Sequence, residues 1–302
     1  MNNYFKNTKL FNYKKSLIEE FSNNKIPKQD YVISNCCYLG QNLIFYSRTE
    51  SFKNNLYNLI PTSWQYHHDL KENEVYHIYL QDPEDLSIEL EWDSEYSQDC
   101  IIDGNMAIQR DFVAKVENKN IYLISKTEIG DGFYNFLRWF LPRNILSQNK
   151  IVLHSSCVIF NNGNANFFLG HSGAGKSTIS DLAGDRIVLG DDMNLLSFEG
   201  GEIYAQAGAI GGKFYPDVDY SKKYKIDNFY CLNQGDENIV VSMGKSKALL
   251  KIISSFANLF WEEITKEEKD HCLDLAKEIV TKFNFYKLTF VKDKSVYEVI
   301  DG

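Results

Sequence analysis

The chain has 302 residues, enough for one large domain or two ordinary ones, and its 44% hydrophobic and 24% charged residues are typical of a globular protein. Its net charge of -9 disfavours a protein whose main partner is nucleic-acid phosphate. The sequence contains neither an apolar run that would span a bilayer nor the apolar core of a signal peptide. We therefore expect a cytoplasmic protein that binds neither nucleic acid nor a membrane.

The N-terminal part, residues 1–130, is predicted to be rich in strands. An amphipathic helix is expected over residues 10–24, and short runs of Tyr, Ile, Val and Leu then follow as far as Lys126. The clearest strand pattern is the alternation of Leu86–Trp92. Residues 81–100 contain eight acidic residues and no Lys or Arg, which is either a solvated strand face or a docking surface for a basic peptide.

An apolar helix is expected next, over residues 131–147, as a connection between two domains. Pro142 lies inside this segment and should kink or end the helix. From residue 148 to residue 302 the pattern changes to strand, glycine-rich turn, helix and strand, which predicts an α/β domain. Its last elements are predicted to be a helix and two strands, over Glu262–Phe283, Phe285–Val291 and Ser295–Ile300.

The segment from Gly170 to Ser177 fits the pattern G-x-x-x-x-G-K-[ST], between a buried strand (ANFFL) and a helix that begins at Lys176. Glycines let main-chain N–H groups converge on a triphosphate, and the helix N-terminus adds positive potential. Lys176 would neutralise the β- and γ-phosphates, while the Ser177 hydroxyl would be a magnesium ligand. The predicted nucleotide-binding residues are Gly170, His171, Ser172, Gly173, Ala174, Gly175, Lys176, Ser177 and Thr178. The alternative is a glycine-rich turn that carries Lys-Ser by chance.

An apolar strand, Ile187–Gly190, ends in Asp191 and Asp192, fifteen residues after Lys176. An acid at a strand end beside a phosphate loop is typical of a magnesium site, although two acids also fit a polar strand end that caps a turn. A pair allows one carboxylate to hold the metal while the other accepts a proton from an attacking hydroxyl. Successive strand residues point to opposite sides, so both acids face the phosphates only if the chain turns after Gly190. His154 lies on the preceding apolar strand, where a structural histidine is the simpler interpretation.

Together these residues resemble the HPr kinase family of bacterial serine kinases, whose fold is related to ATP-dependent phosphoenolpyruvate carboxykinase. The resemblance is strong over residues 150–196 and weak over the rest of the C-terminal half. It implies an HPr kinase-like P-loop fold for residues 148–302, ATP and Mg2+ as cofactors, and phosphorylation of a serine hydroxyl. It also implies Asp191 as the proton acceptor, Asp192 near the metal, and His154 close to the phosphates. Together with Lys176 of the glycine-rich loop, Asp191 and His154 are the predicted catalytic residues. The family often assembles into rings, which implies a homo-oligomer.

The downstream segment YAQAGAIGGKFY lacks the acid and the arginine of the family's corresponding motif, although Glu202 and Lys213 lie nearby and can substitute. HPr is therefore not the expected acceptor. The layout is more similar to HPr kinase-like enzymes of peptide natural-product pathways. This similarity implies a peptide or protein partner that bears an acceptor serine. Residues 1–130 would then form a substrate-docking or accessory domain. Two alternatives are a kinase for a small hydroxyl compound and a module that senses ATP without turnover.

Overall fold

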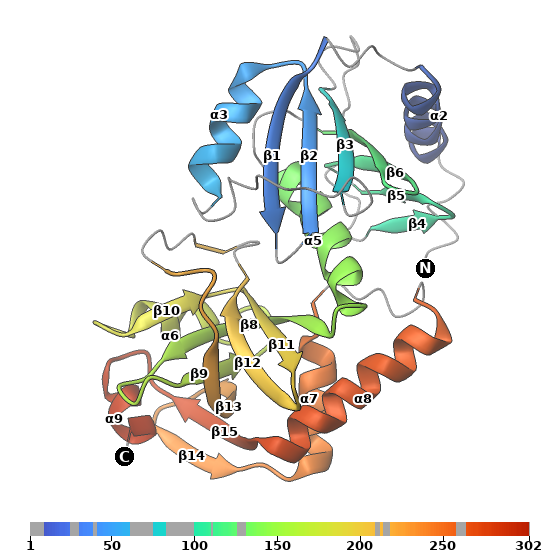
Figure 1. The fold of residues 1–302 in the computed structure, drawn as a ribbon. Coiled ribbons are helices and arrows are strands. Elements are labelled where there is room, and N and C mark those ends of the chain that lie inside the picture. Colours follow the sequence, from blue (N-terminus) through green and yellow to red (C-terminus); the bar gives the residue numbers. More distant parts are fainter. Residues whose placement is uncertain are drawn as a thin grey trace. The chain divides into compact units, whose positions relative to one another are not determined.

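The computed structural model describes residues 9–24, 30–38, 41–60, 75–82, 100–109, 111–125, 131–208, 212–213, 218–257 and 264–301. The chain divides into two compact units, Met1–Trp139 and Phe140–Gly302, which are called here the N-terminal and the C-terminal unit (Figure 1). The boundary lies within one helix, α5 (Asp131–Leu146). In the part of the chain that the structure describes, no helix is long and apolar enough to cross a membrane.

The N-terminal unit is built on a mixed seven-stranded sheet with the strand order β1-β2-β3-β7-β6-β5-β4. The parallel pairs are β2 with β3 and β3 with β7, and the remaining neighbours are antiparallel. The strands are β1 (Val32–Tyr38), β2 (Gln41–Ser47), β3 (Val75–Gln81), β4 (Ile101–Asp103), β5 (Met106–Ile108), β6 (Val113–Glu117) and β7 (Asn120–Ile124).

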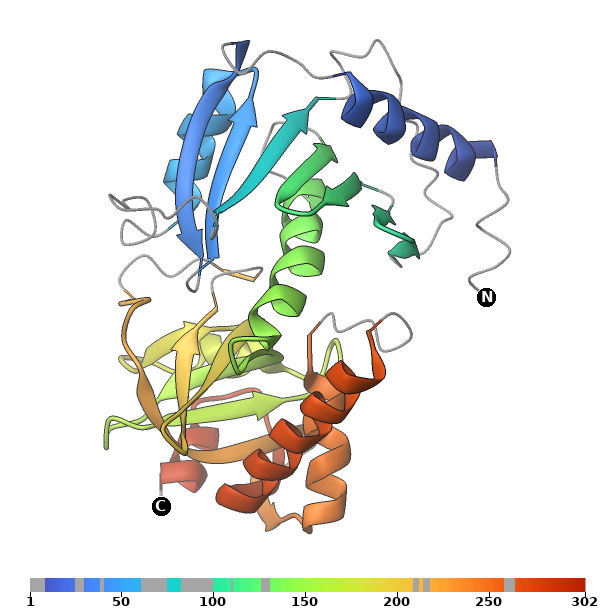
Figure 2. The same ribbon diagram turned by 45° about the vertical axis from the view of Figure 1, so that its right-hand side comes forward.

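Helices cover both faces of this sheet, because successive strand residues point to opposite sides. On β2, Phe45 contacts Phe52 of α3 (Glu50–Leu59) and Phe133 of α5. On the other face, Phe21 of α2 (Lys9–Asn23) packs edge-on against Tyr122 of β7. Figure 2 shows α2 and α3 on opposite sides of the sheet.

Several predictions for this region can be compared with the structure. The helix expected over residues 10–24 is confirmed as α2. The strand Leu86–Trp92 and nearly all of the acidic run lie outside the described residues. The connecting helix continues through Pro142 to Leu146, so Pro142 does not end it. Proline inside a helix costs about 3 kcal/mol, and burial of Trp139, Phe140 and Leu141 beside it offsets that cost.

The C-terminal unit contains an eight-stranded sheet with the order β10-β8-β11-β12-β13-β15-β14, in which β9 pairs with both β8 and β13. The parallel strands are β9, β13 and β15. The strands are β8 (Lys150–Ile159), β9 (Ala165–Leu169), β10 (Ile187–Gly190), β11 (Met193–Glu199), β12 (Glu202–Ala207), β13 (Tyr224–Gln234), β14 (Ile239–Ser242) and β15 (Asn284–Phe290).

The long strand β8 exchanges partners half-way along its length. Its first half pairs with β11, from Lys150 to His154, and the second half pairs with β9 on one edge and β10 on the other. The exchange occurs at His154 and Ser155, where Met193 pairs with His154 and Leu169 pairs with Ser155. The end of β9 and the start of β11 therefore lie at the same level of β8, on either side of it.

Helices and aromatic ladders fill both faces of this second sheet. On one face Phe167, Phe229 and Phe285 stack across the three parallel strands, with ring centroids 5.0 and 4.8 Å apart. The opposite core contains Phe168 together with side chains of α6 (Lys176–Asp181) and α9 (Ser295–Asp301). The other two helices, α7 (Lys245–Ser255) and α8 (Lys266–Lys282), pack against each other (Figure 2).

The prediction for the last element is wrong, because residues 295–301 form helix α9 and not a strand. Asp293, just before the helix, accepts a hydrogen bond from the backbone N–H of Ser295 at 2.9 Å, as an N-cap does. Val296 and Tyr297 are buried and Ile300 packs against the same core, a spacing that suits one helical face. The preceding helix and strand are confirmed as α8 and β15, although α8 begins at Lys266.

Candidate active site

The glycine-rich loop leaves β9 at Leu169 and enters α6 at Lys176, as the sequence predicts. Gly173 and Gly175 have positive φ values of 79° and 107°, which side chains with a Cβ rarely adopt. A Cβ on Gly175 would also lie 2.6 Å from Cζ of Phe290, so only glycine fits there. From the end of β13, the Gln234 side-chain amide donates to the Gly173 carbonyl at 2.6 Å, which holds the loop from the neighbouring strand.

Lys176 is buried, and its ammonium lies within the loop. It donates to the carbonyls of Gly170, at 2.9 Å, and His171, at 3.3 Å. Burial lowers the pKa of Lys176, and the negative charge of Asp192 opposes this shift. The Asp192 carboxylate is thus close enough to Lys176 to interact with its charge, although the two do not form an ion pair.

The two aspartates lie in a bend between β10 and β11, called here the aspartate turn. Both strands pair antiparallel with β8, one after the other, so the chain does not change direction after Gly190 in the way that would point both acids to the phosphates. The carbonyl of Asp192 accepts a hydrogen bond from the Ser155 N–H at 2.8 Å, which ties the turn to β8. The Asp192 Oδ1 atom lies 3.0 Å from Nε2 of His154. His154 is thus beside the carboxylate that interacts with Lys176, and its Nε2–H, in the tautomer that carries it, donates to Asp192.

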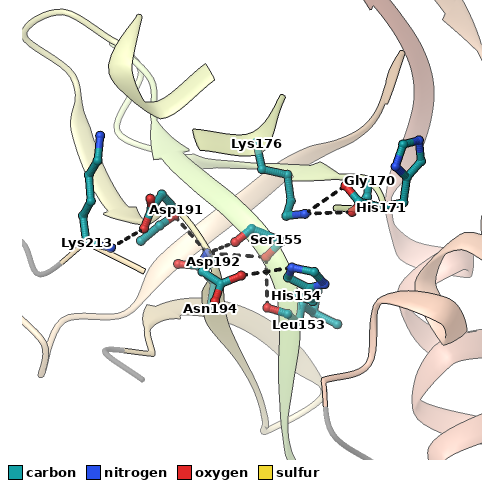
Figure 3. Close-up of polar contacts among 11 residues, drawn as sticks. Leu153, His154, Ser155, Gly170, His171, Lys176, Asp191, Asp192, Asn194 and Lys213 are labelled. Carbon is teal, nitrogen blue, oxygen red and sulfur yellow. Dashed lines mark hydrogen bonds and ion pairs between the residues drawn. The ribbon is translucent and has the colours of Figure 1, made fainter. Parts of the chain in front are cut away.

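Asp191 points in a different direction, as Figure 3 shows. The residue is only 5% exposed, and its Oδ1 accepts a hydrogen bond from the backbone N–H of Lys213 at 2.8 Å. The two adjacent acids therefore have different surroundings. Asp192 lies beside His154 and interacts with the charge of Lys176, while Asp191 lies against residues 212 and 213.

Asn194, a residue that the sequence pattern did not indicate, stabilises the backbone next to the aspartates by hydrogen bonds. Its side chain is fully buried, and its amide donates to the carbonyls of Ser155, at 2.6 Å, and Gly190, at 3.0 Å. Its Oδ1 has no hydrogen-bond partner. The signal in the sequence was a carboxamide in an otherwise apolar strand, two residues after the aspartate pair.

The remaining predicted residues divide by exposure. The side chains of His171, Ser172 and Ser177 are exposed, Thr178 is half-buried and Ala174 is buried. His171 is not free in solvent, because its Nδ1–H donates to the Ser172 carbonyl at 2.6 Å. Of the two proposed substitutes, Lys213 reaches the aspartate pair, whereas Glu202 begins β12 as an exposed residue.

The donor set suits magnesium. Among the described residues no group of three or more His, Cys, Asp or Glu side chains converges on a metal position. Magnesium does not require one, because it prefers oxygen ligands and is commonly held by one or two protein groups together with phosphates and water. Ser177 and Asp192 carry such oxygens, and their assignment as magnesium ligands stays a prediction.

Comparisons with known proteins support part of the resemblance. No family model matches the chain. Segments of it are similar to proteins described as phosphoenolpyruvate carboxykinase (ATP). The relative from Sulfurimonas denitrificans is 32% identical over 112 residues, which is 34% of this chain and 20% of the relative. Those from Christiangramia forsetii and Flavobacterium johnsoniae are 30% identical over 128 residues and 26% identical over 191 residues.

These two alignments cover 39% and 57% of this chain, and 23% and 33% of the respective relatives. The chain thus spans between a fifth and a third of the length of these three curated relatives. The expected kinship with ATP-dependent phosphoenolpyruvate carboxykinase is supported over part of the chain, and the closer relation to HPr kinases stays a prediction.

Proposed function

We propose that this protein is an ATP- and magnesium-dependent serine kinase of HPr kinase-like fold, which transfers the γ-phosphoryl group to a serine hydroxyl of a peptide or protein. One observation carries the proposal. The glycine-rich loop and the aspartate turn lie side by side, on the two edges of strand β8. The loop starts at Leu169, which pairs with Ser155, and the turn ends at Met193, which pairs with the adjacent His154. Phosphoryl transfer depends mainly on positioning and charge neutralisation, and this arrangement supplies both.

The loop and the helix N-terminus bind the phosphates in this mechanism. Main-chain N–H groups around Gly173 and Gly175 and the ammonium of Lys176 stabilise negative charge on the transferred group. Ser177 and Asp192 would hold Mg2+, which neutralises charge on the phosphates when it is bound. His154 holds one oxygen of Asp192 by the 3.0 Å contact, which fixes the direction of the carboxylate.

Asp191 accepts the proton of the attacking serine hydroxyl. One of its oxygens, Oδ1, is bound to the Lys213 N–H, so Oδ2 is the atom available to the hydroxyl. Because Asp191 is almost buried, little water competes for that atom. The carboxylate thereby orients the alcohol and takes its proton as the new O–P bond forms, while the bond from the γ-phosphorus to the bridging oxygen breaks and ADP leaves.

A small-molecule acceptor is the second candidate, and one observation favours it. The curated relatives are named for phosphoenolpyruvate, a small molecule, and this chain matches them in part. An ATP sensor without turnover has less support, because binding alone requires a single metal-directed acid and the site has two.

A phosphoryl-transfer assay with radiolabelled ATP tests the proposal. We expect magnesium-dependent labelling of serine-containing peptides, in preference to free serine or small alcohols. Asp191→Asn should abolish most of this transfer while ATP affinity is largely kept, because an amide cannot accept the proton. Lys176→Ala should weaken binding and transfer together.

Transfer only to small molecules would support the second candidate. ATP binding without transfer to any acceptor would overturn the kinase proposal. Full activity of Asp191→Asn would remove Asp191 from its assigned role.

A further inference from the structure

Residues 212 and 213 pack directly against the aspartate pair. Gly212 has a φ of +72°, and a Cβ at this position would lie 2.2 Å from Oδ1 of Asp191 and 2.9 Å from Cβ of Asp192. Any other residue would therefore displace a carboxylate. Glycine lets the backbone at residue 212 come this close to the two aspartates, and the backbone N–H of the next residue, Lys213, can therefore reach Asp191.

Lys213 is bound at two points. Its backbone N–H donates to Oδ1 of Asp191 at 2.8 Å, and its ammonium forms an ion pair with Asp181. The hydrogen bond to Asp181 raises the pKa of Lys213, and the charges of Asp181 and Asp191 add to this effect, so the side chain is charged at neutral pH. Asp181 is the last residue of α6, the helix that Lys176 begins.

We propose that Lys213 is a positioning residue that links the nucleotide-binding helix to the proton acceptor. This inference rests on the proposed function. The ion pair with α6 holds the Lys213 backbone in place, and that backbone fixes the Asp191 carboxylate. As a result the acceptor hydroxyl can reach only Oδ2, from the side away from Gly212.

The ion pair itself contributes little to folding. The side chains of Lys213 and Asp181 are 55% and 56% exposed, and exposed pairs stabilise proteins only weakly. A purely structural role would therefore leave the kinetics unchanged when the pair is removed, whereas a positioning role predicts a specific loss of kcat. This difference makes the inference testable.

The kinetic test uses the full-length protein and the best acceptor found in the transfer assay. Lys213→Ala should lower kcat about tenfold and leave KM for ATP within about twofold of the wild type. Lys213→Arg should restore most of the activity, because it keeps the charge. Asp181→Asn should resemble Lys213→Ala, and the double variant should be no worse than either single one. Lys223→Ala is the matched control, because it removes another exposed ion pair, with Glu199, and should have no effect.

A second measurement does not depend on transfer. In protein labelled with 15N-lysine, the Lys213 amide is identified by its disappearance in Lys213→Arg. Hydrogen exchange of this amide should be slow in the wild type and faster in Asp181→Asn, because the tether to α6 is lost. Unchanged exchange, or an unchanged kcat in Lys213→Ala, would overturn the inference. If the wild type transfers no phosphoryl group, the proposed function fails, and the exchange result still decides whether the tether exists.

Discussion

Substitution of Asn194 tests whether the aspartate turn depends on one buried carboxamide. In Asn194→Ala the carbonyls of Ser155 and Gly190 lose hydrogen bonds of 2.6 and 3.0 Å. Two such bonds contribute about 2–3 kcal/mol, and removal of the unpartnered Oδ1 returns part of this, so we expect a net loss of about 2 kcal/mol. For a unit of this size, the melting temperature should fall by about 4–8 °C.

The effect on transfer should be larger than the effect on nucleotide binding. The lost bonds hold the turn that carries Asp191 and Asp192, while the glycine-rich loop continues from the opposite edge of β8. Displacement of a catalytic group by about 1 Å can cost a hundredfold in rate. We therefore expect kcat of Asn194→Ala to fall by about ten- to a hundredfold, with KM for ATP nearly unchanged.

Asn194→Asp provides the sharper comparison, because it is isosteric. It would place a carboxylate oxygen where the amide now donates to two carbonyls, so it should be less stable than Asn194→Ala at neutral pH. Asn228→Ala is the control, since it removes a 3.3 Å contact with Asn166 at the far end of β9 from the loop. Calorimetry and transfer kinetics of the three variants decide the matter. An Asp variant at least as stable as the Ala variant would refute the hydrogen-bonding argument.

Two further predictions concern the glycine-rich loop and the N-terminal unit. Gly175→Ala would combine a strained φ of +107° with a 2.6 Å clash against Phe290, so calorimetric titration should show weakened ATP binding. Gly163→Ala is the control: its φ is also positive, at +83°, but the added Cβ meets no atom within 4 Å, and the variant should bind ATP normally. In the N-terminal unit, burial lowers the pKa of Lys14 to about 7 from 10.5, so the unfolded state holds the Lys14 proton more tightly than the folded state. The free energy of unfolding, measured with urea, should therefore rise between pH 7 and pH 10. Lys14→Met should flatten this rise and add about 2 kcal/mol at pH 7, and an equally steep rise in the variant would show that another group is responsible.

Features set by local sequence could be predicted. The glycine-rich loop, its flanking strand and helix, and the apolar strand that ends at Gly190 depend on residues within a few positions of each other, and each is found where the pattern indicates. The error at residues 295–301 is also local. The sequence SVYEVI places apolar residues at spacings that suit a strand or a helix, and contacts with the core containing Ile179 select the helix.

The support of the site could not be predicted, because it depends on contacts between distant segments. Asn194 acts on Ser155, 39 residues earlier, and Lys213 acts on Asp191, 22 residues earlier. The exchange of partners along β8 is likewise a property of the sheet and not of the strand's own sequence. The sequence shows Lys213 only as a basic residue in the segment YAQAGAIGGKFY, which lacks the arginine of the family's motif, and it gives no sign of the contact with Asp191.

The different surroundings of the two acids support different roles for them. Asp192 interacts with the charge of Lys176 and is bound by His154, so its carboxylate lies near the cation that attracts phosphate, and its own negative charge attracts a metal ion. Asp191 is held by a neutral N–H and is nearly excluded from water. A carboxylate that takes a proton must give up its charge during the reaction, and this is easier when no cation is bonded directly to it. The same geometry therefore favours Asp191 as the base and Asp192 as the metal ligand, and the exchange of these roles would require the two carboxylates to exchange their partners, the Lys213 N–H and His154.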